Sequence, residues 1–161
     1  MSYSAGIVVW KEENGALSVL IQGKCRVTEF YTGEILNGFP GGSAESGETS
    51  PAFTALRELK EETGLKPKQG IDLNPLLVYS RFSGDNHYHY FYLVAFSDLE
   101  GKLRTEVIRD NEDILFPPFW MPLSQLSFSL DHPRGLGQLM KTHRGALVNS
   151  IRHLRSLYMV A

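Results

Sequence analysis

The sequence predicts a single α/β domain over residues 1–161, with helices covering both faces of a mixed β-sheet. Three observations predict this fold. Two pairs of strand-like runs are each separated by a turn signal, one helical stripe lies between the pairs, and a second lies near the C-terminal end. The order strands, helix, strands, helix is typical of a sheet sandwiched by helices. A chain of this length buries about two thirds of its unfolded surface in one domain.

The first pair of runs predicts a β-hairpin. Residues 6–10 and 17–21 are rich in Val, Leu and Ile, and Asn14-Gly15 lies between them. Asn-Gly is a strong turn signal because a tight hairpin requires positive φ at both turn residues. We therefore expect two antiparallel strands that lead into the glycine-rich segment 38–42.

The second pair predicts another hairpin. Residues 76–82 and 87–96 read as strands around the turn-rich segment 83–86. Residues 115–123 predict a later strand, and a helix is expected to begin near 124–126.

Residues 51–63 predict an α-helix. Ser50 is a suitable N-cap, and Pro51 suits the first helical position because its missing N–H has no partner there. Alanine, phenylalanine and leucine side chains recur inside the segment at helical spacing. Gly64 is a natural terminator after the last turn.

Three glutamates on this helix suggest a metal site. Glu58, Glu61 and Glu62 stand at i, i+3 and i+4, so their side chains project from one side of the helix. Their repulsion is removed if the oxygens coordinate Mg²⁺ or Mn²⁺. The alternative is an ordinary solvated face on which Arg57 pairs with Glu61. The adjoining glycines of residues 38–42 favour the metal site, because glycine lets backbone groups approach a ligand closely.

These residues resemble the signature of the Nudix hydrolase family, G-x5-E-x7-R-E-U-x-E-E-x-G-U, in which U is a bulky aliphatic residue. Residues 42–48 fit the first half, and residues 57–65 fit every specified position of the second. Between the halves the chain departs from the signature, because eight residues, 49–56, stand in place of seven. The helix start at residues 50–51 places the extra residue in the preceding loop and leaves the helix register intact.

The resemblance implies a Nudix fold, an α/β/α sandwich with a mixed β-sheet. It also implies metal-dependent hydrolysis of a diphosphate linkage in a nucleoside diphosphate derivative, with water attacking phosphorus, a glutamate base, and Mg²⁺ or Mn²⁺ as cofactor. The implied site residues are Glu58 and Glu62 as principal carboxylate ligands, Glu61 as a further ligand or the base, Gly42 as a backbone carbonyl ligand, Arg57 as the residue that orients the carboxylates, and Glu48 as a support for Arg57 and the helix.

The resemblance further implies an acid in the polar segment before residues 115–123. Glu112 is the first choice for a metal-binding or proton-accepting residue because it lies eight residues before Trp120, and Asp113 is the next choice. The alternative is a solvated acidic loop. The acids of this segment are Glu106, Asp110, Glu112 and Asp113.

Basic side chains that flank the expected site are candidates for binding phosphate. They are Lys24, Arg26 and Arg81. His87 and His89 share one face of a predicted strand, a spacing that also suits a metal pair. We favour an ordinary sheet position for both, because aromatic residues alternate with them. A histidine that faces the cleft could contact a base or a phosphate.

Two other functions remain open at this point. One is a catalytically silent module that binds or senses a nucleotide such as ADP-ribose. The other is an isopentenyl diphosphate isomerase, which shares the fold but requires a cysteine facing the substrate. Cys25 is the only cysteine and lies in no motif of that kind. A lone cysteine also excludes an intrachain disulfide and favours a reducing compartment, so a cytoplasmic location is expected.

The charge and hydropathy of the chain limit the kinds of partner that it is expected to contact. Lys and Arg number 16 against 18 Asp and Glu, and no apolar run of 18 residues predicts a membrane span. From His132 onward the chain has no acid but five Lys and Arg residues. Residues 145–159 predict a basic amphipathic helix that docks on the sheet or on a partner subunit, so a homodimer is possible. The basic segment could contact RNA, but we favour the docked helix and a small nucleotide diphosphate substrate.

Overall fold

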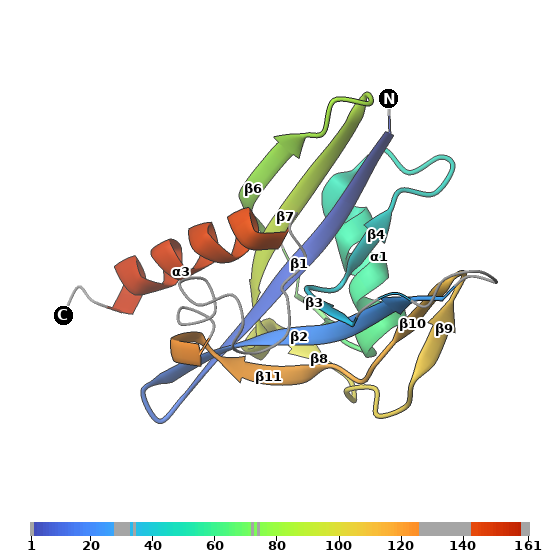
Figure 1. Ribbon diagram of the computed structural model, residues 1–161. Helices are drawn as coiled ribbons and strands as arrows, with labels where there is room; N and C mark the ends of the chain where they lie inside the picture. The colour runs from blue at the N-terminus through green and yellow to red at the C-terminus, as the bar shows by residue number, and fades with distance from the viewer. Residues whose placement is uncertain are drawn as a thin grey trace.

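The computed structural model describes residues 2–27, 33, 35–71, 73, 75–125 and 143–158. Within these residues, helix α1 (Pro51–Thr63) covers one face of a mixed β-sheet, and helix α3 (Arg144–Tyr158) lies across the other face (Figure 1). This arrangement of helix, sheet and helix confirms the predicted α/β fold class.

Nine of the described strands form one sheet. Its hydrogen-bonded order is β6-β7-β1-β2-β10-β9, while β4 pairs with β1, and β3 and β11 pair with β2. Strands β1 and β7 run parallel, whereas the other pairs are antiparallel, so the sheet is mixed. The strands of this sheet are β1 (Ser2–Glu13), β2 (Ala16–Arg26), β3 (Leu36–Gly38), β4 (Gly41–Ser43), β6 (Leu76–Phe82), β7 (His87–Ala95), β9 (Ile108–Asp110), β10 (Asp113–Leu115) and β11 (Phe119–Pro122). The 3₁₀ helix η1 (Phe96–Asp98) and a small pair, β5 (Lys66–Pro67) with β8 (Leu99–Glu100), lie beside it.

Both predicted hairpins are confirmed. Asn14 and Gly15 have φ of 53° and 81°, the two positive values that a type I′ turn requires. The predicted strand 115–123 is wrong in its continuity, because β10 ends at Leu115 and β11 begins at Phe119. Two prolines lie in the gap, and proline has no N–H to donate to a sheet. Residues 123–125 are helical, and residue 126 lies outside the described residues.

Strands β1 and β2 diverge, and this divergence makes room for a site. They pair only where Trp10–Glu13 meet Ala16–Val19. Beyond that point β1 pairs with β4, while β2 pairs with β3 and then with β10. The two strands therefore carry different neighbours on either side of the gap between them.

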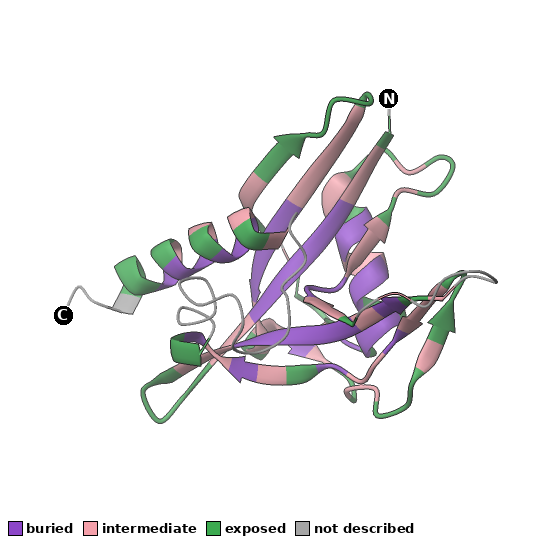
Figure 2. Ribbon diagram, in the orientation of Figure 1, coloured by how far each residue is buried: buried purple, intermediate pink, exposed green. Residues whose placement is uncertain are grey.

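Apolar residues on both faces of the sheet fill two clusters, seen as the buried segments in Figure 2. Successive residues of β1 and β2 point to opposite faces, so Val8, Val19 and Ile21 pack toward α3, and Val9 and Leu20 pack toward α1. The centre of the sheet is therefore buried on both sides, and it holds α1 rigidly beside the diverging strands.

Helix α3 lies where the sequence predicted a helix over 145–159; residue 159 is outside the described residues. Its inward face buries Ala146, Leu147, Ile151 and Leu154, while Arg152 and Arg155 are exposed. Within the described part of the chain, the helices are too short or too polar to cross a membrane.

Candidate metal and phosphate site

Local sequence signals set the bounds and the rotation of α1. The Ser50 hydroxyl accepts a hydrogen bond from the Phe53 N–H at 3.3 Å, and Gly64 closes the helix with φ of 85°. These caps confirm the predicted helix 51–63. The buried face of the helix includes two polar residues of interest, Glu58 and Glu62, beside its apolar residues. Packing against the sheet therefore directs two carboxylates inward.

Three carboxylates converge at the divergence of β1 and β2. Glu58 and Glu62 on α1 and Asp110 at the end of β9 each offer an oxygen, and these oxygens all lie within 4.8 Å of one another. Glu58 is 7% exposed and Glu62 only 2%, whereas Asp110 is exposed. The Glu61 side chain is 54% exposed and pairs with Arg57 at 2.9 Å. The structure thus brings two of the three predicted helix glutamates to one point, while the third, Glu61, lines the cleft in a half-exposed position and is not one of the converging acids.

Burial makes Glu62 an unusual acid. Its Oε2 accepts a hydrogen bond from the Gln22 side-chain amide. Its Oε1 has no hydrogen-bond partner among the described residues. Burial raises the pKa of Glu62 to about 8, the charge of Lys24 opposes this rise, and the charge of Glu58 adds to it. Burial also raises the pKa of Glu58, although Arg57 opposes that rise.

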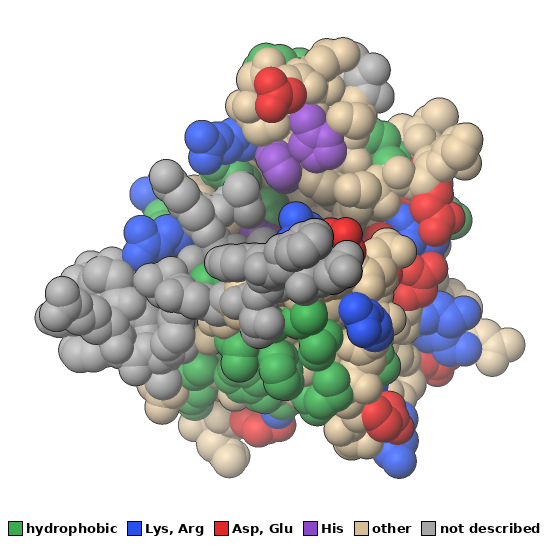
Figure 3. Space-filling view, turned by 45° about the vertical axis from the view of Figure 1, so that its right-hand side comes forward, with side chains coloured by type: hydrophobic (Ala, Val, Ile, Leu, Met, Phe, Trp, Pro, Cys, Tyr) green, Lys and Arg blue, Asp and Glu red, His purple; other side chains and the backbone are tan. Residues whose placement is uncertain are grey.

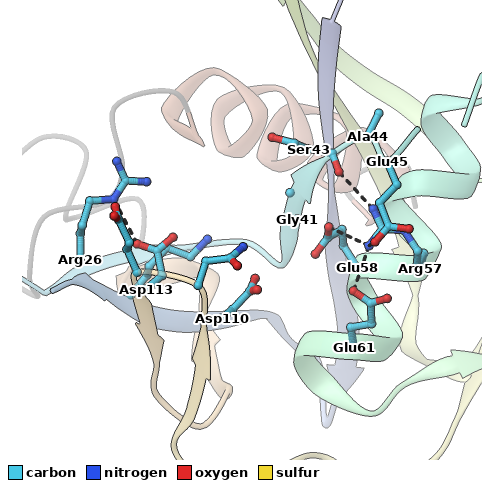
Figure 4. Close-up of a pocket in the computed structure, with 14 residues that line it drawn as sticks. Arg26, Gly41, Ser43, Ala44, Glu45, Arg57, Glu58, Glu61, Asp110 and Asp113 are labelled. Atoms are coloured by element: carbon cyan, nitrogen blue, oxygen red, sulfur yellow. Dashed lines mark hydrogen bonds and ion pairs between the residues drawn. The ribbon is translucent and has the colours of Figure 1, made fainter. Parts of the chain in front are cut away.

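Arg57 connects the helix to the loop before it. Its guanidinium donates to Glu48 at 2.5 Å. It also donates to Glu61 at 2.9 Å and to the backbone carbonyl of Ser43 at 3.0 Å, and it lies 3.0 Å from Glu58 (Figure 4). Burial alone would lower the pKa of Arg57, but the hydrogen bond to Glu48 and the charges of Glu58 and Glu61 raise it above its ordinary value. Arg57 therefore stays charged and holds three glutamates in fixed positions.

Glu48 keeps its contact with Arg57 despite the extra residue between them. Glu48 itself closes a turn in which its N–H donates to the Glu45 carbonyl at 3.1 Å and Gly47 has φ of 88°. The Glu48 carboxylate also accepts a hydrogen bond from the Thr54 hydroxyl, which lowers the pKa of Glu48. The helix register is undisturbed.

Two glycines bring the backbone of β4 against the carboxylates. A Cβ on Gly42 would lie 2.5 Å from Oε1 of Glu58, and a Cβ on Gly41 would lie 2.7 Å from the carbonyl oxygen of Ala5. Neither position has room for a side chain. The glycine loop therefore lets the backbone approach the site, as its sequence predicted.

Glu58 and Asp110 line a cleft of about 870 Å³, while the more deeply buried Glu62 is not among its lining residues. Lys24 and Arg26 line it from β2, and Arg26 pairs with Asp113 at 3.3 Å on the wall opposite α1 (Figure 4). Glu112 also lines the cleft, but it is not one of the three converging acids. Arg81 lies on β6 and is not among the lining residues. Of the three predicted phosphate-binding residues, the structure therefore places Lys24 and Arg26 at the cleft. The described residues that line it are Lys24, Arg26, Gly41, Gly42, Ser43, Ala44, Glu45, Arg57, Glu58, Glu61, Asp110, Asn111, Glu112 and Asp113.

A smaller hollow of about 150 Å³ shares Lys24 and both glycines with the cleft and carries histidines on its other side. Figure 3 shows histidine side chains grouped on one face of the molecule. The Ser4 hydroxyl lies 3.0 Å from Nε2 of His87 and 2.9 Å from Nδ1 of His89. Nδ1 of His143 accepts a hydrogen bond from the backbone N–H of Phe39 at 2.9 Å. His89 and His143 line the hollow.

The pH dependence of stability offers a first test of the buried acid. Between its ordinary pKa of 4.5 and about 8, Glu62 holds a proton in the folded, metal-free state that the unfolded state releases, so stability falls as pH rises through this window. Burial lowers the pKa of His143 to about 3 and also lowers that of His89. These two histidines act in the opposite direction, but only below their ordinary pKa of 6.5. We expect the metal-free protein to lose about 2 kcal/mol between pH 6.5 and 8.

The measurement is urea unfolding in EDTA across this range, with Glu62→Gln as the matched variant. Wild type minus variant isolates the contribution of this one carboxyl from every other titrating group. A difference that stays constant from pH 6.5 to 8 would contradict the raised pKa of Glu62.

The donor set fits a hard divalent cation. Carboxylate oxygens are the ligands that Mg²⁺ and Mn²⁺ prefer, and the arrangement offers them from Glu58, Glu62 and Asp110. The unpartnered buried Oε1 of Glu62 and the open backbone at Gly42 are the features that such an ion would complete. The residues present therefore fit a metal site.

Sequence reasoning missed two residues and ranked a third too low. Asp110 was weighed behind Glu112 and Asp113, yet it is the acid that joins the helix glutamates. Gln22 and Arg104 were not considered, although both contact Glu62. Period-two alternation could have found Gln22, since it precedes Lys24 and Arg26 on the same face of β2. We find no comparable sequence signal for Arg104.

Comparisons with known proteins agree with this fold. No sequence among curated proteins matches the chain. Solved structures with the same fold include the NUDIX domain of Shewanella oneidensis NrtR complexed with ADP ribose, with 19% identity, a TM-score of 0.64, and coverage of 94% of this chain and 87% of that one. A MutT NUDIX hydrolase from Burkholderia pseudomallei has 19% identity, a TM-score of 0.59, and coverage of 92% and 96%. A mutT/nudix family protein from Listeria innocua has 20% identity, a TM-score of 0.53, and coverage of 99% and 98%.

The sequence also matches the family model of the NUDIX domain over residues 2–142, which includes every residue of the carboxylate cleft. The family signature, the fold and the family match therefore agree, and the chain belongs to the NUDIX family.

Proposed function

We propose that the protein hydrolyses a diphosphate linkage in a nucleoside diphosphate derivative with the help of Mg²⁺ or Mn²⁺. The observation that carries this proposal is the convergence of oxygens from Glu58, Glu62 and Asp110, because Glu58 and Asp110 line a cleft that Lys24 and Arg26 also line. Buried acids beside basic side chains suit a cation that is held between the protein and a phosphate chain.

The carboxylates have different roles in this proposal. Glu58, Glu62 and Asp110 hold the ion, with a backbone carbonyl of Gly42 as a further ligand. When bound, the ion supplies Lewis-acid stabilisation of the phosphate charge and a more acidic water. Glu61 lines the cleft and is half exposed, so it is the helix acid placed to accept a proton from the attacking water.

The cations of the site divide into two groups. Arg57 is occupied by glutamates, with its side chain 16% exposed, and it orients the acids. Lys24 and Arg26 line the cleft, and they would bind the nonbridging oxygens of the diphosphate. Because Arg26 already pairs with Asp113, a phosphate would compete with that carboxylate for the guanidinium. Lys24 is therefore the stronger candidate of the two.

Two alternatives are weaker. A silent nucleotide-binding module is consistent with the ADP ribose in the Shewanella oneidensis domain, but it would not require three converging acids. An isomerase would need a cysteine in the cleft. Cys25 is buried between Lys24 and Arg26 along β2, so alternation turns it away from the cleft that they line, and its thiol donates to the carbonyl of Gly33 at 2.9 Å.

The decisive experiment measures product release from a panel of nucleoside diphosphate derivatives with EDTA, Mg²⁺ or Mn²⁺. The panel includes ADP-ribose, dinucleoside polyphosphates, oxidised nucleotides, capped RNA and coenzyme A. We expect metal-dependent cleavage of at least one member, and the product pair identifies the phosphorus attacked. Nucleotide binding without turnover on any member would favour the silent module instead.

Asp110 and Glu112 provide a matched pair for the loop acid. We expect Asp110→Asn to lower kcat/KM about 100-fold and to raise the Mg²⁺ concentration needed for half-maximal rate, because it removes a ligand. Glu112→Gln should change kcat/KM less than about 10-fold. Initial rates across a Mg²⁺ titration separate the two variants. The reverse order would restore Glu112 as the principal acid of this loop.

Gly42→Ala tests the close approach of β4 to the helix. The new methyl would lie 2.5 Å from Oε1 of Glu58, so the flexible end of that side chain must move. We expect a loss of about 10- to 100-fold in Mg²⁺ affinity with a small change in metal-free stability. Isothermal titration and urea unfolding measure the two quantities. Unchanged Mg²⁺ affinity would show that Glu58 tolerates the displacement.

A further inference from the structure

Gln22 is a buried polar residue that contacts the most buried acid of the site. It is 2% exposed and lies on β2, on the face that Leu20 and Lys24 share. Its side-chain amide donates to Oε2 of Glu62, and its own side-chain oxygen accepts a hydrogen bond from Nη2 of Arg104 at 3.3 Å. Both polar atoms of the amide therefore have a partner. The NH₂ group faces the acceptor oxygen of Glu62, and the oxygen faces the donor group of Arg104.

Arg104 is held in place by hydrogen bonds to the backbone carbonyls around it. Its Nε donates to the backbone carbonyl of Glu62 at 2.7 Å, and Nη2 donates to the carbonyl of Phe116 at 3.0 Å. Its backbone N–H donates to the carbonyl of Thr63 at 2.9 Å. The last carbonyls of a helix lack partners within the helix, so Arg104 satisfies the end of α1 and ties it to the segment after β10.

The chemistry of arginine decides which way the Gln22 amide points. A guanidinium has only donors, so it donates to the Gln22 oxygen and cannot form a hydrogen bond with the Gln22 NH₂ group. The NH₂ group must then face Glu62, whose ionised carboxylate, the form that would bind a metal, offers only acceptors. Rotating the amide by half a turn would place oxygen against oxygen and nitrogen against nitrogen. Arg104 thus selects the one orientation in which Gln22 donates to Glu62.

The contacts of Glu62 are asymmetric as a result. Oε2 is bound by Gln22, while Oε1 is buried and has no partner among the described residues. A pair that served stability alone would leave no buried acceptor without a donor, because such an oxygen carries a desolvation cost. The asymmetry is expected when the second oxygen serves a ligand.

We propose that Gln22, oriented by Arg104, is a positioning residue that holds one oxygen of Glu62 and presents the other to the metal ion. This inference rests on the proposed function, because it requires a metal at the carboxylates. Neither Gln22 nor Arg104 need touch substrate. Partners of this kind, one contact removed from the metal, typically change metal affinity 10- to 100-fold.

The test compares Gln22→Met with wild type in Mn²⁺ binding, measured by titration without substrate. Methionine keeps the length of the side chain and removes both hydrogen bonds. We expect the Kd for Mn²⁺ to rise about 10- to 100-fold. Ser150→Ala is the matched control, because it also removes a fully buried polar atom but lies on α3 at the opposite face of the sheet, and its Kd should equal that of wild type.

Two further readouts separate positioning from simple structural support. The rise in Tm that Mg²⁺ causes should shrink in Gln22→Met, and the KM for nucleotide at saturating Mg²⁺ should stay within about threefold of wild type. Arg104→Lys keeps the positive charge but cannot form the same fork, and it should weaken Mn²⁺ binding in the same direction. It provides the second variant if Gln22→Met does not fold.

Different results would contradict the role of Gln22 and the proposed metal-dependent function. A variant with lower metal-free Tm but the Mn²⁺ affinity of wild type would make Gln22 a structural residue and overturn the inference. Absence of Mn²⁺ and Mg²⁺ binding in wild type itself would overturn the proposed function.

Discussion

A Glu62→Gln variant is expected to lose about 1,000-fold in kcat, equivalent to about 4 kcal/mol of transition-state stabilisation. Glutamine keeps the volume of the side chain but supplies no negative charge, and its NH₂ group would take the place of one carboxylate oxygen. Glu62 accepts a hydrogen bond through Oε2 and leaves Oε1 unpartnered. Glutamine has only one acceptor oxygen, so it cannot replace both of these oxygens. The variant should therefore lose the principal buried ligand.

The Glu62→Gln substitution should lower activity without lowering the stability of the metal-free protein. Burial raises the pKa of Glu62 because a charge is costly there, so a neutral amide should leave the metal-free protein at least as stable at pH 8. Steady-state rates with Mg²⁺ and urea unfolding in EDTA measure the two effects. Glu13→Gln is the control for a glutamate change on the surface, where the side chain is 68% exposed.

The outcome that contradicts this assignment is a folded Glu62→Gln protein with a kcat within about tenfold of wild type. The chemistry would then depend on other acids of the cleft, with Glu61 the first to test.

An Arg57→Met variant is expected to lose about 3 to 5 kcal/mol of stability. Arg57 lies within 3.0 Å of Glu48, Glu58 and Glu61, and the side chains of Glu48 and Glu58 are each only 9% exposed. Removing the one cation would leave two nearly buried carboxylates without compensation. The loop that holds Gly42 should also loosen, because Arg57 binds the carbonyl of Ser43.

Arg57→Lys separates charge from geometry. Lysine restores one positive charge, but a single ammonium group cannot reproduce the planar fork that reaches Glu48 and Ser43 together, so we expect a loss of about 1 to 2 kcal/mol. Lys60→Met on the same helix is the exposed control and should change stability by less than about 0.5 kcal/mol. The measurement is urea unfolding in EDTA, which removes any contribution from metal. An Arg57→Met protein as stable as the control would mean that the carboxylates are protonated or solvated in its absence.

Sequence patterns predicted the structure most accurately where the signals come from residues close together in the chain. Ser50 and Gly64 set the bounds of α1, and the spacing of Glu58 and Glu62 along one helix directed both to the same side. The Asn14-Gly15 turn likewise determined the first hairpin. Each of these features depends on residues a few positions apart, so helical or strand periodicity was enough to predict it.

The loop acid shows where that reasoning stops. Asp110 pairs with Asp113 across the β9–β10 hairpin, which leaves Asn111 and Glu112 as the two turn residues. The sequence predicts only a polar loop before residues 115–123 and gives no strand register for it. A shift of one residue in strand register moves a side chain to the other face of the sheet. Glu112 therefore lines the cleft from the turn, while Asp110 at the end of a strand meets the helix glutamates.

The sequence by itself determined the fold class, the capped helix and two of the three converging acids, because local periodicity and capping suffice for these. Only the tertiary structure decided that Glu61 lies outside the converging set, that Asp110 completes it, and that Gln22 and Arg104 support Glu62. These contacts join residues some 40 to 80 positions apart. They form because β1 and β2 diverge beside α1, and that divergence is set by the pairing of the whole sheet.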